Sequence, residues 1–220
     1  TATVTLTVTA VNDAPVLAAV DAVSFDEDGS GSTTLVGSDI DSTDLTYSVS
    51  GGTDITATVD GMTLTLTPAL NWNGSATIAV TVSDGTLESE DTFGLTITPV
   101  NDAPLAEEQM VITSEDTSVA INLTGTDVDG DQLTYSVLTS PSNGSLSGTA
   151  PSLTYTPNSD YYGSDSLTFQ VNDGTVNSSI ATVTIIINSV NDGPIISLPV
   201  SFTFDEDSSL VVDFTPYLDD

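Results

Sequence analysis

The chain contains no lysine, arginine, histidine or cysteine among its 220 residues, whereas 32 residues are acidic and the formal net charge is −32. Without cationic side chains the protein cannot neutralise nucleic-acid phosphates, and an anionic membrane surface would repel it. We therefore expect no nucleic acid and no direct membrane contact. The missing residue types also exclude a Ser-His-Asp triad, a catalytic cysteine, a Schiff-base lysine and a thiolate metal site, so the composition predicts a protein that is not an enzyme.

The absence of cysteine also removes the disulfide bonds that stabilise many small secreted domains. Stability must then come from a hydrophobic core or from bound metal, and a hydrophobic content of 38% is sufficient for a core. No apolar run is long enough to cross a bilayer, and no signal-peptide pattern is visible. Both ends of the chain look as if they were cut from a longer series of repeats, so we draw nothing from these two absences.

A five-residue motif recurs at a domain-length interval. VNDAP occupies residues 11–15 and 100–104, and VNDGP occupies 190–194, so the copies begin 89 and 90 residues apart. This period predicts the domain organisation. We expect residues 1–10 to be the last strand of a preceding repeat, 11–99 and 100–189 to be complete repeats, and 190–220 to begin a truncated third repeat.

Alternating apolar residues dominate the segments between these motifs. ATVTLTV at 2–8, DTFGLTI at 91–97 and ATVTIII at 181–187 precede the three junctions, and LTYSV at 45–49 recurs at 133–137. Period-two alternation indicates strands with one buried face, and Asp-Gly pairs between them indicate hairpin turns. About seven short strands per repeat, with almost no helical pattern, predict an all-β protein of tandem immunoglobulin-like Greek-key sandwiches.

The carboxylates cluster at matching points of the repeat. A Glu-Asp pair follows each junction by about 15 residues, an Asp-x-Asp segment comes 12 residues later, and an Asp-Gly turn and the junction Asn-Asp complete the set. Of the 32 acidic residues 25 are aspartate, whose short side chain suits oxygen cages built from loops. Calcium takes six to eight oxygen ligands of this kind, so the clusters predict Ca²⁺ sites.

The segment DVDGDQLTYSVL is not an EF-hand loop. Asp127, Asp129 and Asp131 fit its first positions, but Gln132 stands where glycine is needed and Leu138 where the bidentate glutamate belongs. The residues that follow read as a strand, so distant segments must complete any site.

With an acidic pair, an Asp-x-Asp segment, an Asp-Gly turn and Asn-Asp-x-Pro at each junction, the chain resembles the cadherin repeat. It is most similar to the bacterial cadherin-like tandem repeats of giant surface adhesins. The resemblance implies junction calcium ions with three ligand sets: Asn12, Asp13, Asp39, Asp41 and Asp84 near residue 13; Glu27, Asn101, Asp102, Asp127, Asp129 and Asp173, with Asp131 as an addition, near residue 102; and Glu115, Asn191 and Asp192, with Asp219 or Asp220, near residue 192.

Simpler interpretations compete with these assignments. Asn-Asp-x-Pro is also an ordinary turn, and Asp84 and Asp173 also suit hairpin turns without metal. Trp72, Tyr161 and Tyr162 could stack on sugars, although packing at the core or its edge is the commoner role. Paired carboxylates can hydrolyse glycosides, but these acids recur with the repeat instead of forming one cleft.

The resemblance implies a calcium-rigidified extender of a large bacterial cell-surface adhesin, which holds a distal binding domain away from the cell. Its partners would be neighbouring repeats of the same chain, and its location would be extracellular. The alternative is a module that binds surface polysaccharide or self-associates through a sheet face, for which exposed aromatic side chains on both repeats would be the sign.

Overall fold

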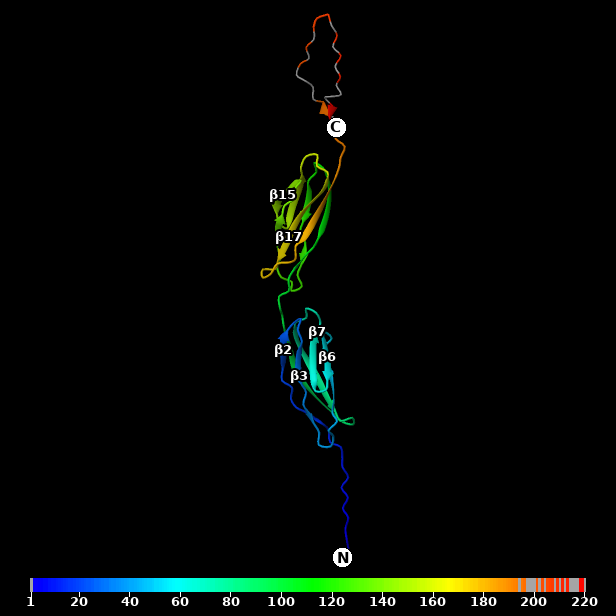
Figure 1. Cartoon of the computed structure of the whole chain (residues 1–220). Helices are drawn as coiled ribbons and strands as arrows, with labels where there is room; N and C mark the ends of the chain where they lie inside the picture. The colour runs from blue at the N-terminus through cyan, green and yellow to red at the C-terminus, as the bar shows by residue number, and fades with distance from the viewer. Residues whose placement is uncertain are drawn as a thin grey trace. The chain divides into compact units, whose positions relative to one another are not determined.

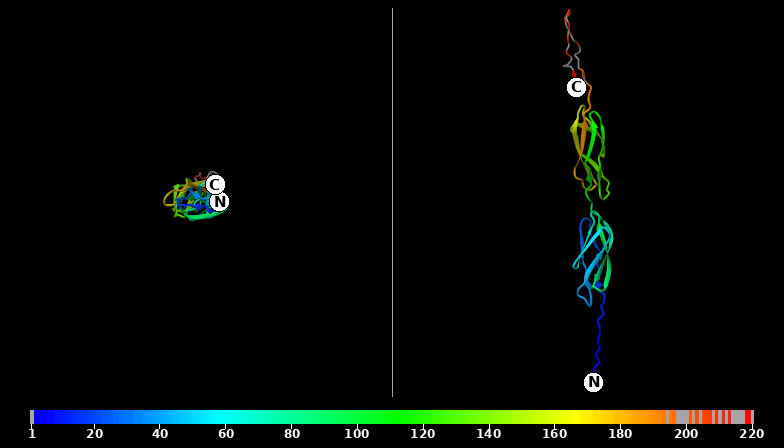
Figure 2. Two further views of the ribbon diagram at one scale, coloured as in Figure 1. Left: turned by 90° about the horizontal axis from the view of Figure 1, so that it is seen from below. Right: turned by 90° about the vertical axis from the view of Figure 1, so that its right-hand side faces the viewer.

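The computed structural model describes residues 2–193 without interruption and, beyond them, residues 195, 196, 201, 203, 205–207, 209, 211, 213, 218 and 219. The described residues form strands and turns and no helix, as Figure 1 and the turned views of Figure 2 show. Consequently none of them belongs to an apolar helix that could span a membrane. The chain divides into two compact units, unit 1 (Thr1–Asp102) and unit 2 (Ala103–Asp220).

Unit 1 contains a four-stranded sheet, a three-stranded sheet and a two-stranded ribbon. Their orders are β2-β9-β8-β5, β3-β7-β6 and β1-β4, and every pairing is antiparallel except that of β2 with β9. The strands are β1 (Val16–Leu17), β2 (Val23–Asp26), β3 (Gly31–Thr34), β4 (Gly37–Ser38), β5 (Thr46–Ser50), β6 (Ile55–Asp60), β7 (Thr63–Pro68), β8 (Gly74–Ser83) and β9 (Glu88–Thr98).

Unit 2 repeats this plan strand for strand. Its sheets have the orders β11-β18-β17-β14, β12-β16-β15 and β10-β13, with β11 parallel to β18. The strands are β10 (Leu105–Ala106), β11 (Gln109–Ser114), β12 (Val119–Asn122), β13 (Gly125–Thr126), β14 (Thr134–Thr139), β15 (Gly144–Thr149), β16 (Ser152–Pro157), β17 (Gly163–Asn172) and β18 (Ala181–Asn188). Beyond them β19 (Ile195–Ile196) pairs antiparallel with β20 (Leu218–Asp219).

The all-β fold is therefore confirmed, and the expected seven strands correspond to the seven longer strands of each unit. The two additional strands have two residues each, which is too short for any period to appear in the sequence. Residues 2–15 contain no strand, and Val4, Leu6 and Val8 are each at least 85% exposed. The interpretation of residues 1–10 as the last strand of a preceding repeat stays a prediction, as do the other domain boundaries.

Each unit has its own hydrophobic core between its two larger sheets. In unit 1 the inward positions of β9, Phe93, Leu95 and Ile97, meet those of β7, Leu64 and Leu66, and all five side chains are buried. The alternate positions of these strands carry mainly threonine, a β-branched residue that suits a solvated sheet face. Period-two alternation thus determines both the strands and the side of each strand that packs.

One core position of unit 2 holds a carboxylate. Asp165 on β17 is buried and accepts hydrogen bonds from the backbone N–H groups of Ser142 (2.9 Å), Asn143 (2.8 Å) and Ser166 (2.9 Å). The hydroxyl of the buried Tyr155 on β16 donates a fourth bond at 2.9 Å. Since Asp165 and Tyr155 belong to different sheets, this network joins the two layers of the sandwich.

Unit 1 fills the matching positions with apolar side chains. Leu66 stands where unit 2 has Tyr155, and Ala76 stands where it has Asp165. The two units therefore pack the same place in the core by different means, one with hydrocarbon alone and one with a satisfied polar pair.

Burial tends to raise the pKa of the Asp165 carboxyl, but its four donors outweigh burial and hold the pKa below the ordinary value of 3.8. Burial and the adjacent carboxylate raise the pKa of the Tyr155 phenol, so its hydroxyl remains a donor. A depressed carboxyl pKa contributes stability above the ordinary value, and that contribution is lost as pH falls through the depressed pKa.

We expect Asp165→Asn to lower the free energy of unfolding of unit 2 by about 1–3 kcal/mol at pH 7, because an amide cannot accept from all four donors. The difference between variant and parent should shrink as pH falls below 3.8, because the unfolded carboxyl then takes up a proton that the folded carboxylate, with its lower pKa, binds only at lower pH. Urea titrations by far-ultraviolet circular dichroism at pH 7 and pH 3 measure both quantities. Fluorescence of Trp72, the single tryptophan, reports unit 1 as an internal control. An equal difference at both pH values would contradict the ionised network.

Candidate metal centres

One end of unit 1 gathers residues that are far apart in the sequence. The side-chain Nδ2 of Asn12 donates to Oδ2 of Asp84 at 2.7 Å, and the backbone N–H of Asp13 donates to Oδ2 of Asp41 at 2.9 Å. Asp84 lies in the turn between β8 and β9, and Asp41 lies between β4 and β5. The structure thus brings the first junction motif to the Asp-x-Asp segment and the Asp-Gly turn, as the sequence predicts; their role as ligands stays a prediction.

The Asp-Gly aspartates also stabilise their own turns. Oδ1 of Asp84 accepts from the N–H groups of Thr86 (2.6 Å) and Leu87 (2.7 Å). The Leu87 N–H, the Asn12 amide and the Thr86 N–H together lower the pKa of the Asp84 carboxyl. Asp173 makes the same two backbone contacts in unit 2, at 2.6 and 2.7 Å. A hairpin turn without metal therefore accounts for the Oδ1 contacts of Asp84 and Asp173. Oδ2 of Asp84 in addition accepts the hydrogen bond from Asn12.

The first aspartate of each Asp-x-Asp segment has a buried oxygen without a donor. Oδ1 of Asp39 accepts from the N–H groups of Asp41 and Ser42, both at 2.7 Å, and Oδ1 of Asp127 accepts from the Asp131 N–H at 3.2 Å. Oδ2 of Asp39 and Oδ2 of Asp127 are buried and have no hydrogen-bond partner. A buried carboxylate oxygen without a partner is costly, and a hard cation would satisfy it. The partnerless Oδ2 atoms of Asp39 and Asp127 therefore fit a hard cation in both units.

The Asp-x-Asp segment of unit 2 carries a third carboxylate. Asp127, Asp129 and Asp131 each place an oxygen within 4.8 Å of the others. Thr43 occupies the position of Asp131 in unit 1. The sequence named Asp131 as an addition to the site, and the structure places it with the other two.

The glutamates lie at the opposite end of each unit, because β2 and β11 run parallel to the last strand and end beside it. Glu27 is 3% exposed; Oε1 accepts from the Val100 N–H at 2.6 Å and Oε2 from Nδ2 of Asn73 at 3.1 Å. Glu115 is 4% exposed, and its Oε1 accepts from the Val190 N–H. Each glutamate therefore contacts the residue directly before a junction Asn-Asp.

The three junction asparagines make one recurring contact. Nδ2 donates to the carbonyl of the next aspartate in each copy, at 3.2 Å from Asn12, 2.9 Å from Asn101 and 2.8 Å from Asn191. The prolines that follow the first two copies, Pro15 and Pro104, are buried. The junction motif thus repeats one local side-chain contact, and in the first two copies its proline is buried.

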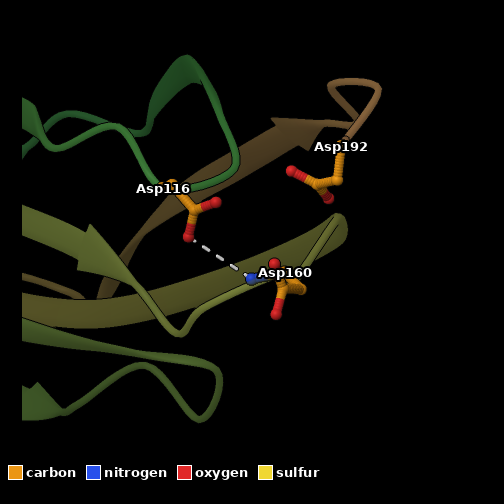
Figure 3. Close-up of side chains that lie close together, drawn as sticks. All are labelled: Asp116, Asp160 and Asp192. Atoms are coloured by element: carbon orange, nitrogen blue, oxygen red, sulfur yellow. Dashed lines mark hydrogen bonds between the residues drawn. The ribbon is translucent and has the colours of Figure 1, made fainter. Parts of the chain in front are cut away.

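A further acidic cluster lies at the glutamate end of unit 2, and the sequence did not single it out as a site. Carboxylate oxygens of Asp116, Asp160 and Asp192 lie within 4.8 Å of one another, and Figure 3 shows the three side chains facing a common space. Oδ1 of Asp116 accepts from the Asp160 N–H at 3.3 Å (Figure 3). Unit 1 repeats the contact with Asp28 and the N–H of Asn71, at 3.4 Å. Both donors have a positive φ, 57° at Asp160 and 56° at Asn71, which Asp and Asn tolerate well.

Part of the predicted set stays untested. The side chain of Asp219 and the whole of Asp220 lie outside the described residues. The junction near residue 102 combines residues of two units, so their union in one site remains a prediction. Those of unit 1 are Glu27, Asn101 and Asp102, and those of unit 2 are Asp127, Asp129 and Asp173.

Comparison with known proteins identifies the family of the two units. Residues 12–98 and 101–186 each match the family model described as a bacterial Ig domain. A search of curated protein sequences found no match.

Among solved structures, the chain is similar to the human desmocollin-1 ectodomain at 14% identity and a TM-score of 0.52, over 83% of this chain and 42% of that one. It also aligns with human protocadherin-24 EC1-2 at 18% identity and a TM-score of 0.48, over 80% and 99% of the two chains. An endo-fucoidan hydrolase of glycoside hydrolase family 107 aligns at 21% and 0.38, over 81% of this chain and 29% of its own length. At these low identities the similarity to desmocollin-1 shows only a shared fold. The two alignments with TM-scores below 0.5 support no conclusion.

We expect Asn73→Ala to lower the free energy of unfolding of unit 1 by about 1.5 kcal/mol in chelator, because it removes a donor from the buried Glu27 carboxylate. Tyr162→Ala is the matched control in unit 2. Tyr162 occupies the equivalent position and is exposed, so its loss should change stability by less than about 0.5 kcal/mol. Circular dichroism in urea, with Trp72 fluorescence to assign the transition of unit 1, gives both values. Equal effects of the two substitutions would show that Asn73 does not support Glu27.

Proposed function

The chain belongs to the bacterial Ig domain family, and from that premise we propose that it is a calcium-rigidified extender segment of a large bacterial cell-surface adhesin. Tandem sandwiches supply length, and ions at their ends restrict bending between neighbours. Such a segment holds a distal binding domain away from the cell. Its location is extracellular, and its partners are neighbouring repeats of the same chain.

The observation that carries this proposal is the buried, partnerless oxygen of Asp39, which recurs at Asp127. Both repeats have the same unsatisfied acceptor at the same place. A structural turn would need only Oδ1, which already accepts backbone N–H groups in both units. The second oxygen is available to an ion.

The distribution of charge supports sites at the ends. The nine strands β10–β18 of unit 2 contain one acidic residue, Asp165, and it is buried. The remaining acidic residues between 103 and 193 lie in turns and at the ends of the unit. Crowded carboxylates repel one another without a cation, and coordination converts that repulsion into a fixed arrangement.

Calcium suits these sites better than magnesium does. The candidate donors are carboxylates and asparagine amides of irregular loops, and Ca²⁺ accepts six to eight oxygens in flexible geometry, whereas Mg²⁺ demands a near-ideal octahedron. Extracellular calcium modules bind with a Kd of about 10⁻⁴ to 10⁻³ M, which matches calcium outside the cell.

The aromatic side chains do not favour the polysaccharide-binding alternative. Trp72 and Tyr161 pack against the cores of their units, and Tyr162 is 65% exposed. Asn73 takes the position of Tyr162 in unit 1, so within the described residues this exposed aromatic side chain is not repeated. The absence of enzymatic activity stays a prediction.

We expect calcium to stabilise unit 1 through Asp39. A site at 100 times its Kd gains about 2.7 kcal/mol from linkage, and Asp39→Asn should remove most of that gain while changing the stability in chelator little, since the amide oxygen can still accept the turn N–H groups. Asp54→Asn, an exposed aspartate between β5 and β6, removes the same charge as a control. Thermal melts followed by Trp72 fluorescence in calcium, magnesium and chelator measure the effect. A loss of equal size in calcium and in chelator would assign Asp39 to the fold instead of the ion.

Removing Asp127 and Asp129 tests rigidity. In millimolar calcium, small-angle scattering of Asp127→Asn/Asp129→Asn should give a shorter and more variable end-to-end distance than the parent, because the junction near residue 102 loses two ligands. Circular dichroism should be unchanged. Asp54→Asn/Asp60→Asn removes two exposed charges elsewhere and should behave like the parent.

Two results would count against calcium-dependent rigidity at the junction near residue 102. Wholesale unfolding of the double variant would assign these carboxylates to the fold of unit 2. A variant as stiff as the parent would mean that packing around the buried Pro104 restricts bending.

A further inference from the structure

The two Asp-x-Asp segments differ in how many carboxylates converge. In unit 2, Asp127, Asp129 and Asp131 each place an oxygen within 4.8 Å of the others, and among the described residues unit 1 has no such group of three. Both segments are followed closely by a third aspartate, but in unit 1 it stands one residue later, at Asp44. The two segments therefore carry equal charge and arrange it differently.

The backbone at residue 130 contributes to this difference. Gly130 has a φ of 80°, in the left-handed region that glycine adopts readily, and the N–H of the next residue, Asp131, donates to Oδ1 of Asp127 at 3.2 Å. Ser42 occupies the same position in unit 1 and does not have a positive φ. The turn at Gly130 thus brings the third carboxylate of unit 2 back to the first.

Asp127 is also less satisfied by the protein than its counterpart Asp39. Oδ1 of Asp39 accepts two backbone N–H groups, both at 2.7 Å, whereas Oδ1 of Asp127 accepts one at 3.2 Å. Oδ2 is buried without a partner in both residues. The cluster of unit 2 therefore combines three neighbouring carboxylates with a buried acceptor, and the chain has no lysine, arginine or histidine to neutralise them.

The number of charged ligands affects how tightly a loop holds calcium. The dissociation constants of oxygen-ligand calcium sites vary with ligand charge and with the rigidity of the site. Converging carboxylates repel one another without a cation, and a bound cation relieves that repulsion. Thr43 takes the place of Asp131 in unit 1 and brings no charge. We therefore expect a higher calcium affinity in unit 2.

We propose that Asp131 sets the calcium affinity of unit 2, so that its Asp-x-Asp segment keeps an ion at calcium concentrations at which the segment of unit 1 has released its own. This role of Asp131 rests on the proposed calcium function and adds regulation to it. Repeats with and without the third carboxylate respond to different calcium concentrations. As calcium falls, the junctions of one chain then lose their ions in sequence instead of together.

A charge-neutral exchange tests the position of the third carboxylate. Asp131→Thr/Gln132→Asp gives unit 2 the order found in unit 1 and leaves the net charge at −32. In calcium titrations of the isotope-labelled chain followed by NMR, the Val128 amide should reach its midpoint at about tenfold higher calcium than in the parent, because the site loses one charged ligand. The Ile40 amide reports unit 1 in the same sample and should keep its midpoint.

The reciprocal exchange tests a gain of affinity. Ser42→Gly/Thr43→Asp/Asp44→Gln gives unit 1 the order found in unit 2, again without a change in net charge. The Ile40 amide should then respond at about tenfold lower calcium than in the parent, and the Val128 amide should keep its midpoint. Circular dichroism in chelator checks that both variants retain the β signature.

Three outcomes would contradict this role of Asp131. Equal midpoints for Ile40 and Val128 in the parent would remove the order of release. An unchanged midpoint at the altered site of either variant would show that the third carboxylate does not set affinity, and the proposed function would stand, because it rests on Asp39 and Asp127. No response of either amide to calcium would remove both the role of Asp131 and the proposed function.

Discussion

Every carboxylate in this chain must be satisfied without a side-chain cation, and much of the structure follows from that constraint. Backbone N–H groups, amides, hydroxyls, water and added ions are the only partners left. Turns supply N–H groups in pairs, which explains why Asp39, Asp84 and Asp173 sit where two consecutive N–H groups converge on Oδ1. Strands supply few, because their N–H groups are committed to the ladders. Between residues 103 and 193 every acidic residue except Asp165 lies outside the strands, whereas the strands of unit 1 carry Asp26, Asp60, Glu88, Glu90 and Asp91.

Glu27 and Glu115 are also satisfied by backbone N–H groups, but the donors follow the last strand of each unit instead of lying in the turn of the acidic residue itself. Glu27 and Glu115 are buried, and each accepts from the N–H of the valine two residues after the last strand of its unit, Val100 or Val190. Their carboxylates therefore hold the chain as it leaves the sheet, whether or not an ion is present. This contact gives the acidic pair a role in the fold in addition to its candidate role at the junction.

The sequence predicted much of the fold, because alternation in β8, β9, β17 and β18 is long enough to be read. It did not predict β1, β4, β10 or β13, whose two residues have no period. The sequence also did not predict the buried Asp165, because its stability in the core depends on a hydrogen bond from Tyr155, which is ten residues away in sequence and on the other sheet. Asp160 was missed for a related reason. It lies in a turn that joins two strands, belongs to no repeated acidic motif and is asparagine in unit 1, so only the folded backbone brings it to Asp116 and Asp192.

The difference between the Leu66–Ala76 pair and the Tyr155–Asp165 pair affects whether neighbouring repeats can exchange strands while they fold during synthesis. Adjacent domains of similar sequence can exchange strands while they fold, a characteristic failure of repeat proteins. If β17 entered the sheet of unit 1, Asp165 would be buried beside Leu66, with no phenol to donate to it. If β8 entered unit 2, Ala76 would leave the Tyr155 hydroxyl without its carboxylate. The Leu66–Ala76 and Tyr155–Asp165 pairs are therefore each satisfied only within their own unit, which favours pairing of each strand within the domain that encodes it.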